Sequence, residues 1–401
     1  MTPGSSSGAP EPHDLRAEAQ RHYEPYLADL RQLVDLDCGT YLPEGVNRVA
    51  DHLQTRFAED GWSVERVRHS PERGDPQLGD LLIATLRGAR GFGQGGHRVL
   101  LAGHMDTVFP EGTAAERPFR VEGDRAFGPG VSDMKGGLLI GLYAVRCLLT
   151  LGFDGFESIT YICNPDEEIG SPFSGPHILE RAKESDVCFV LEGARENGDI
   201  VSARKGVTDV RLTVQGRAAH AGVEPERGRS ASLQAAHTTI ALHELNGRWP
   251  GVTVNVGVIQ GGTRPNVVTE RCELQVDVRA PTARAFEEAL AAVRRVAAAT
   301  VVPDTAIDVT PMSGFPPMER TEATGVLVQR AKDIASDLGF ELRDAATGGA
   351  SDANPVAGLG VPTLDGLGPI GGSDHAPGEW LDLSSVVPRM ALLSALVASE
   401  P

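Results

Sequence analysis

Apolar residues recur at helical spacing near the start of the chain. Within residues 14–61 they fall three and four positions apart, as at Leu30, Leu33 and Val34. This period is typical of helices that bury one face. The stretch is long enough for two helices, and the second is expected at residues 45–57.

Short apolar runs then predict buried strands. These runs are residues 81–86, 99–102, 158–163 and 187–191. The apolar stretch 137–151 lies between the second and third runs and is long enough for a buried helix. Alternation of strands and helices predicts an α/β layer with a largely parallel sheet.

The pattern changes near Lys205. Strands are expected at 210–214, 252–259, 272–278 and 306–309, with helices at 230–245 and 283–299. The order β-α-β-β-α-β is that of a ferredoxin-like α+β unit. Helices are expected again at 324–338 and 386–397.

These patterns divide the chain into domains. A unit of residues 206–314 would interrupt a larger domain made of 14–205 and 315–401. Residues 1–13, rich in Pro, Gly and Ser, are expected to form a disordered tail.

Charge and composition narrow the functional classes. The chain has 401 residues, with 37 Lys and Arg against 55 Asp and Glu, and a formal net charge of −18. This excess argues against binding to nucleic acid or to an anionic membrane surface. No apolar run approaches the roughly 20 residues of a membrane helix.

The cysteines and the N-terminus suggest a compartment. The five cysteines have no metal or redox spacing, and four lie in apolar runs, so we expect buried free thiols. The N-terminus lacks a basic segment followed by an apolar one, so no secretory signal is expected. A reducing cytoplasm fits both observations.

Residues whose side chains can bind metal ions come immediately after the predicted strands. His104 and Asp106 follow the second strand, Glu167 and Glu168 the third, and Glu192 the fourth. Open α/β sheets build their sites in the loops at the carboxyl ends of strands. One of the adjacent glutamates could bind metal while the other serves as general base for water.

Two further candidates lie in glycine-rich segments. Asp133 precedes an expected helix and could simply cap it, and His375 could be a structural loop histidine. Taken together, the candidates supply enough ligands for two zinc ions, each with one histidine and one glutamate and both bridged by an aspartate. This set is His104, Asp133, Glu168, Glu192 and His375.

Three motifs carry a family resemblance. They are G-H-M-D-T-V-F-P at 103–110, G-x-x-D-M-K-G-G at 130–137 and D-E-E-x-G-S at 166–171. From about Leu27 to Ala398 the chain resembles the two-zinc exopeptidases and deacylases of metallopeptidase family 20. These include glutamate carboxypeptidase, acetylornithine deacetylase and succinyl-diaminopimelate desuccinylase, and the details are most similar to the first.

The resemblance implies roles for the candidates. One zinc ion would be held by His104 and Glu192, the other by Glu168 and His375, with Asp133 between them. Glu167 would be the general base and proton shuttle, and Asp106 would orient His104. The Asp133–Met134 peptide bond is expected to be cis. Cobalt or manganese could substitute for zinc.

The resemblance also implies a zinc-exopeptidase-like catalytic domain with a mixed, mostly parallel sheet. The ferredoxin-like unit would be a lid that mediates homodimers. His220, in G-R-A-A-H-A-G at 216–222, would stabilise an oxyanion, in dimers that of the partner subunit. Asn266 and Arg279 would contact polar groups of the substrate, and the loop 347–353 its carboxylate. Without the resemblance, His220 would read as a turn residue and Arg279 as a surface residue.

The implied function is zinc-dependent hydrolysis of an amide bond to an amino acid with a free carboxylate. The substrate would be a small peptide or an N-acyl amino acid, as for a carboxypeptidase of the glutamate type. An N-acyl-amino-acid deacylase or a dipeptidase is the alternative. The segment Met312–Met318 has no arginine, although glutamate-specific relatives can carry one there, so an apolar or smaller substrate stays open. A non-catalytic homologue is disfavoured because Glu167 and all the ligand positions are present.

Overall fold

The chain forms two compact units in the computed structural model, which describes residues 8–90 and 96–399. Unit 1 runs up to residue 202 and resumes at 320–346 and from 351 onward, and unit 2 consists of 203–319 and 347–350. The first helix, α1, begins at Pro12. Residues 1–7 of the expected tail lie outside the described part of the chain.

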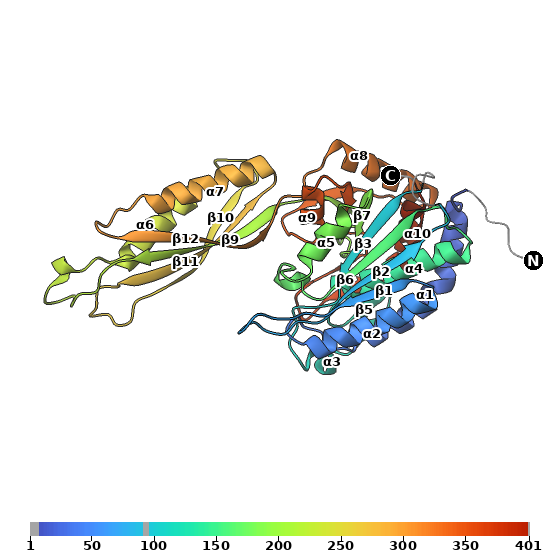
Figure 1. Ribbon diagram of the computed structural model, residues 1–401, viewed down its shortest axis with the longest axis horizontal. Coiled ribbons are helices and arrows are strands. Elements are labelled where there is room, and N and C mark those ends of the chain that lie inside the picture. The colour runs from blue at the N-terminus through green and yellow to red at the C-terminus, as the bar shows by residue number, and fades with distance from the viewer. Residues whose placement is uncertain (1–7, 91–95, 400–401) are drawn as a thin grey trace, which may run out of the picture. The chain divides into compact units, whose positions relative to one another are not determined.

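A six-stranded mixed sheet is the centre of unit 1 (Figure 1). Its order is β1-β2-β6-β3-β7-β14. The strands are β1 (Ser63–Val67), β2 (Leu81–Arg87), β3 (Arg98–His104), β6 (Ser158–Asn164), β7 (Val187–Val190) and β14 (Thr363–Leu364). The pairs β6/β3, β3/β7 and β7/β14 are parallel, whereas β1/β2 and β2/β6 are antiparallel. The mostly parallel mixed sheet is therefore confirmed.

Both faces of this sheet are covered. Consecutive residues of β3 and β7 are buried, although neighbouring side chains of a strand point to opposite faces. Helices α4 and α5 both contact β3, and α1 and α10 pack against α4. The helices of unit 1 are α1 (Pro12–Val34), α2 (Pro43–Glu59), α3 (Thr113–Glu116), α4 (Gly136–Thr150), α5 (Gly175–Ala182), α8 (Glu322–Asp337), α9 (Ala353–Gly358) and α10 (Val386–Ala398).

A small antiparallel sheet connects two loops that carry candidate residues. Its order is β15-β16-β5-β4. The strands are β15 (Gly371–Gly372), β16 (Trp380–Asp382), β5 (Arg125–Phe127) and β4 (Arg120–Glu122). The loop between β15 and β16 contains His375, and β5 leads toward Asp133. Pairing of β16 with β5 thus ties the two loops to one frame. A further pair, β8 (Ile200–Arg204) with β13 (Asp344–Thr347), lies where the chain passes between the units.

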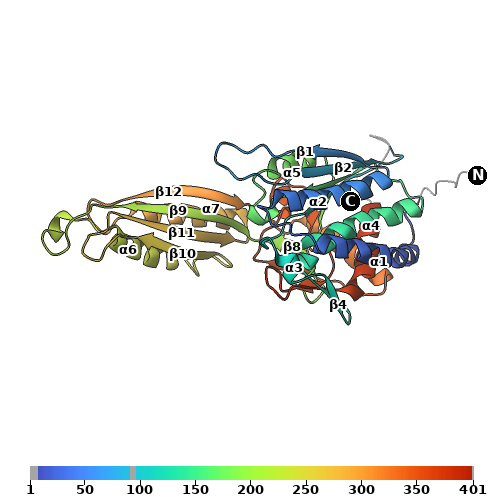
Figure 2. The ribbon, with the colours of Figure 1, turned by 90° about the horizontal axis from the view of Figure 1, so that it is seen from below.

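Unit 2 has the predicted ferredoxin-like arrangement (Figures 1 and 2). Its antiparallel sheet has the order β10-β11-β9-β12. Its elements are β9 (Gly206–Gln215), α6 (Ala231–His243), β10 (Thr253–Gly261), β11 (Arg271–Ala280), α7 (Ala283–Ala298) and β12 (Ala306–Phe315). Alternate residues of β11, such as Leu274 and Val276, are buried in one core with residues of both helices. The helices therefore cover one face of the sheet.

Two expectations from composition can be compared with the structure. All five cysteines are buried and free, as predicted. Among the described residues, no helix is both long enough and apolar enough to cross a bilayer.

Candidate metal centre

The three adjacent parallel strands of unit 1 bring candidate residues to one edge of the sheet. His104 is the last residue of β3, Glu167 and Glu168 begin the short helical turn after β6, and Glu192 follows β7. Because β6, β3 and β7 are parallel, their carboxyl ends meet at the same edge. Residues far apart in the sequence therefore lie together.

Asp133 lies between the two histidines. Its Oδ1 is 3.0 Å from Nε2 of His104, and its Oδ2 is 2.9 Å from Nε2 of His375. Each histidine also lies near one glutamate. Nε2 of His104 is 3.7 Å from Glu192 Oε1, and Nε2 of His375 is 3.2 Å from Glu168 Oε2. The peptide bond after Asp133 is cis, as the resemblance implied.

Asp106 contacts His104 through its backbone carbonyl and the turn of Glu167 and Glu168 through its carboxylate. Nδ1 of His104 lies 2.9 Å from the carbonyl oxygen of Asp106, which can only accept, so a neutral His104 has its lone pair on Nε2. The Asp106 carboxylate accepts hydrogen bonds from the Thr40 hydroxyl at 2.6 Å and from the backbone N–H groups of Glu167 and Glu168. It thereby fixes the turn that carries the two glutamates.

The cluster attracts positive charge. Hydrogen bonds to Asp133 and Glu168 raise the pKa of His375 to about 11. Burial lowers the pKa of His104, but the charge of Glu192 and hydrogen bonds to aspartates outweigh it, and the net pKa is well above the ordinary value. Burial raises the pKa of Asp133, but hydrogen bonds with the two histidines outweigh this effect, and the net pKa lies below the ordinary value. Several carboxylates in a buried space need compensating cations.

The donor set fits a metal ion. One group of ligand atoms from His104, Asp133 and Glu168, and another from His104, Glu167 and Glu192, each lie within 4.8 Å of one another. Imidazole nitrogen and carboxylate oxygen are ligands that zinc accepts. Burial, reinforced by the charge of Glu192 and opposed by His104, raises the pKa of Glu167 well above its ordinary value. A raised pKa suits a group that exchanges protons near neutral pH.

Sequence reasoning missed two buried carboxylates that support the cluster. Glu379 accepts a hydrogen bond from the backbone N–H of Asp133 at 3.0 Å. Asp352 pairs with the Asn164 side-chain amide and accepts from the Ser171 hydroxyl at 2.5 Å, at the two ends of the loop that carries the adjacent glutamates. Burial raises the pKa of Glu379 and of Asp352 to about 7. Their partners are distant in sequence, so no local pattern marks them.

Unit 2 holds the other three candidates, His220, Asn266 and Arg279. His220 is exposed, and its Nδ1 accepts a hydrogen bond from the backbone N–H of Gly222 at 3.1 Å. The neutral ring therefore carries its proton on Nε2. The carbonyl of Asn266 accepts from the N–H of Ala221, so the two loops lie side by side.

Arg279 connects two segments predicted to contact substrate. Its Nε is 3.1 Å from both carboxylate oxygens of Asp277, and its Nη1 donates to the carbonyl of Gly348 at 2.9 Å. The arginine therefore lies beside the glycine-rich loop at residues 347–353.

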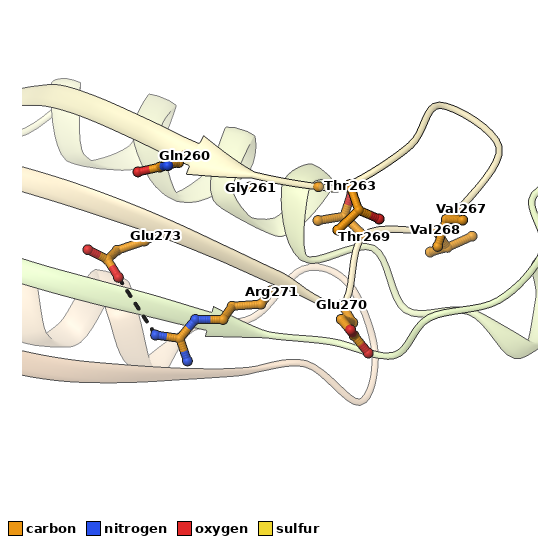
Figure 3. Close-up of a pocket in the computed structure, with 10 residues that line it drawn as sticks. Gln260, Gly261, Thr263, Val267, Val268, Thr269, Glu270, Arg271 and Glu273 are labelled. Atoms are coloured by element: carbon orange, nitrogen blue, oxygen red, sulfur yellow. Dashed lines mark ion pairs between the residues drawn. The ribbon is translucent and has the colours of Figure 1, made fainter.

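A hollow of about 470 Å³ lies in unit 2, at the end of the hairpin formed by β10 and β11, and Figure 3 draws the residues that line it. Val267 and Val268, which follow Asn266, line it, as do Arg271 and Glu273. None of the ten candidate residues lines this hollow.

The fold and the cluster of histidine nitrogens and carboxylate oxygens are those of a metal-dependent hydrolase. Residues 100–399 match the family model described as Peptidase family M20/M25/M40, and the chain belongs to this family. It is a hydrolase of peptide or N-acyl amino acid bonds. The resemblance inferred from the motifs is therefore confirmed.

Individual relatives support the same class. The chain is 30% identical over 377 residues to carboxypeptidase G2 of Pseudomonas sp. (strain RS-16), covering 92% of this chain and 88% of the relative. It is 29% identical over 359 residues to a succinyl-diaminopimelate desuccinylase of Acidovorax ebreus, covering 84% and 89%. The structure of aminopeptidase PepT from Bacillus cereus matches with a TM-score of 0.75 and 25% identity, covering 94% and 98%.

Proposed function

We propose that the chain is a carboxypeptidase of the glutamate-carboxypeptidase type that uses two zinc ions. The observation that carries this proposal is the position of Asp133, whose two oxygens each face a different histidine. A carboxylate in this position can bridge two cations. His104 and Glu192 would hold one ion, and Glu168 and His375 the other.

The chain's own residues then divide the remaining work. Bound zinc polarises a carbonyl and lowers the pKa of water. Glu167 takes a proton from the attacking water and passes it to the leaving nitrogen. In a dimer, His220 would donate from Nε2 to the oxyanion in the active site of the partner subunit. Arg279 and Asn266 contact polar groups of the substrate, and the guanidinium of Arg279 is suited to a carboxylate.

A second candidate is an N-acyl-amino-acid deacylase. The 29% identity to a succinyl-diaminopimelate desuccinylase supports it, as does the absence of arginine from the sequence of Met312–Met318. Both proposed enzymes would hydrolyse an amide bond to an amino acid, and they differ in the acyl group that they accept.

The test is a screen of N-acyl amino acids and dipeptides after zinc has been restored, read by release of the amine. The glutamate-carboxypeptidase proposal expects the highest kcat/KM on substrates with a C-terminal glutamate. Preference for another amino acid would replace it with the deacylase or dipeptidase. No hydrolysis of any substrate would contradict both.

We also propose that the chain forms a homodimer through unit 2. Strand β10 is at the edge of its sheet, and Val258 and Ile259 on it are exposed. Leu233 and Ile240 of α6 are exposed too, and a spacing of seven residues puts them on one helix face. Exposed apolar side chains next to an open strand edge favour association.

A further inference from the structure

A mostly apolar pocket of about 480 Å³ lies in unit 1 beside the metal cluster. Two short segments, residues 39–42 and 107–111, form most of its lining, and Glu168 and Ile169 complete it. Tyr41 and Val108, one from each segment, are 59% and 42% exposed, and a ligand in the pocket could cover these apolar side chains. Its volume is in the range of small-molecule sites.

Backbone contacts join the two segments of the pocket wall. Residues Gly39 and Thr107 form a parallel bridge, and the N–H of Thr40 donates to the carbonyl of Thr107 at 3.2 Å. A Cβ on Gly39 would lie 2.3 Å from the carbonyl oxygen of Phe109, so only glycine permits this approach. The two segments are therefore held together before any ligand binds.

Three contacts connect this wall to the cluster. The hydroxyl of Thr40 donates to the Asp106 carboxylate, which also fixes the turn of Glu167 and Glu168. Glu168 itself lines the pocket. On the opposite side, Arg117 lies 4.6 Å from the centre of the Phe109 ring and donates to the carbonyl of Ala376, next to His375. A group in the pocket would therefore lie beside Glu168, one of the candidate metal ligands.

The charge of the residues that line the pocket indicates whether it accepts the acyl group or the leaving amino acid. Besides the proposed zinc ligand Glu168, its charged lining residue is Glu111, and among its described lining residues there is no lysine or arginine. An adjoining hollow that shares Tyr41 with the pocket is also predominantly acidic. Such surroundings disfavour a carboxylate, so they suit neither the leaving amino acid nor a succinyl group.

We infer that this pocket is the acyl-side subsite and selects an apolar acyl group larger than acetyl. The inference rests on the proposed hydrolysis and names its substrate class: N-acyl amino acids, or peptides, with an apolar group before the scissile bond. Tyr41, Val108 and Phe109 are the specificity-determining residues.

The test compares three acyl groups on the same amino acid, using L-glutamate and L-alanine in separate series. The 4-methylpentanoyl and succinyl groups have nearly the same shape and differ in carrying an isopropyl group or a carboxylate, while acetyl lacks any group to fill the pocket. In the zinc-loaded enzyme, kcat/KM for 4-methylpentanoyl should exceed the values for succinyl and acetyl by at least about tenfold.

A charge-reversing variant completes the test. Val108→Lys should raise the ratio of succinyl to 4-methylpentanoyl kcat/KM by about tenfold or more. The matched control is Val121→Lys on β4, because Val121 is also 42% exposed and does not line the pocket. Val121→Lys should keep the ratio of succinyl to 4-methylpentanoyl kcat/KM within about twofold of the wild-type value.

The outcomes separate the two proposals. Hydrolysis with acetyl or succinyl preferred, or an equal change of ratio in both variants, would overturn the subsite and leave the hydrolytic function standing. If zinc-loaded enzyme with native thermal stability hydrolyses no substrate of either series or of the wider screen, the proposed function fails and the subsite with it.

Discussion

Glu379 accepts a hydrogen bond from the backbone N–H of Asp133 at 3.0 Å. The same carboxylate also accepts from the N–H groups of Gly130 and Ser132, both at 2.8 Å. Glu379 lies four residues after His375, so a single buried side chain connects both loops that face each other across the cluster. We interpret Glu379 as a positioning residue for Asp133.

Replacing this carboxylate should loosen the cluster. In Glu379→Gln the amide NH2 cannot accept, and each buried N–H left unpaired costs about 1–3 kcal/mol. We expect zinc affinity or kcat/KM to fall about 10- to 100-fold, as for other residues that support metal ligands. Zinc content after dialysis and the kinetics measure this. Glu24→Gln, at an exposed position of α1, is the control, and wild-type values in both variants would contradict the role.

The variant Glu167→Gln should show whether Glu167 is a general base or a zinc ligand. If Glu167 transfers protons, kcat should fall about 100- to 10,000-fold while zinc content stays at the wild-type value. Glu168→Gln should instead lose zinc, because Oε2 of Glu168 is one of the donor atoms beside His375. Loss of metal from the Glu167 variant would make this residue a ligand, which its position near His104 and Glu192 also permits.

Zinc binding should release protons. Without metal, His375, with a pKa raised to about 11, is protonated at pH 7, and the pKa of His104 is raised as well. Zinc needs the neutral rings, so binding displaces at least one proton per chain and weakens as the pH falls. Calorimetry at pH 7 in buffers with different ionisation enthalpies gives both this number and the zinc stoichiometry. A buffer-independent heat would contradict the prediction.

The architecture and much of the candidate site could be predicted because their signals are local. Strands β3, β6 and β7 are apolar over nearly their whole length, as in a sheet covered on both faces. Side chains that follow such strands reach a common edge whatever the details of packing. For this reason the sequence predicts that His104, Glu168 and Glu192 lie together.

What could not be predicted depends on contacts between distant segments. The partners of Glu379 and Asp352 lie between about 180 and 250 positions away, and only tertiary structure selects them. The edge strand β1 was missed because its residues are exposed or half-buried and it has no apolar run. Strands such as β15, with two residues, are too short to show a period.

The proposed dimer predicts the effect of a charge on α6. Ile240 is 61% exposed in the single chain, so Ile240→Glu should leave the folded unit intact but disfavour burial against a second copy. Light scattering after size-exclusion chromatography should shift from a dimer to a monomer mass. Val326→Glu on α8 of unit 1 is the control, at a side chain 52% exposed. A wild-type protein that is monomeric at all concentrations would refute the dimer.

The stability of unit 1 should depend on Asp29, which joins three helices away from the cluster. Arg56 of α2 donates to both oxygens of this buried α1 carboxylate, at 2.7 and 3.0 Å, and the Tyr143 hydroxyl of α4 donates at 2.8 Å. Although burial raises it, hydrogen bonds from His52, Arg56 and Tyr143 lower the pKa of Asp29 to about 2.

Because this pKa is depressed in the folded state, its contribution to stability is present above the unfolded value near 4 and is lost as the pH falls toward 2. Asp29→Asn should lower the free energy of unfolding at pH 7 by about 2–3 kcal/mol, and the difference from wild type should shrink between about pH 5 and pH 2. Urea unfolding across this range measures it. Asp51→Asn removes an exposed carboxylate paired with Arg66 and should cost less than about 1 kcal/mol. A deficit in Asp29→Asn that is the same at every pH would instead indicate altered packing, because only an ionised carboxylate loses its stabilising effect on protonation.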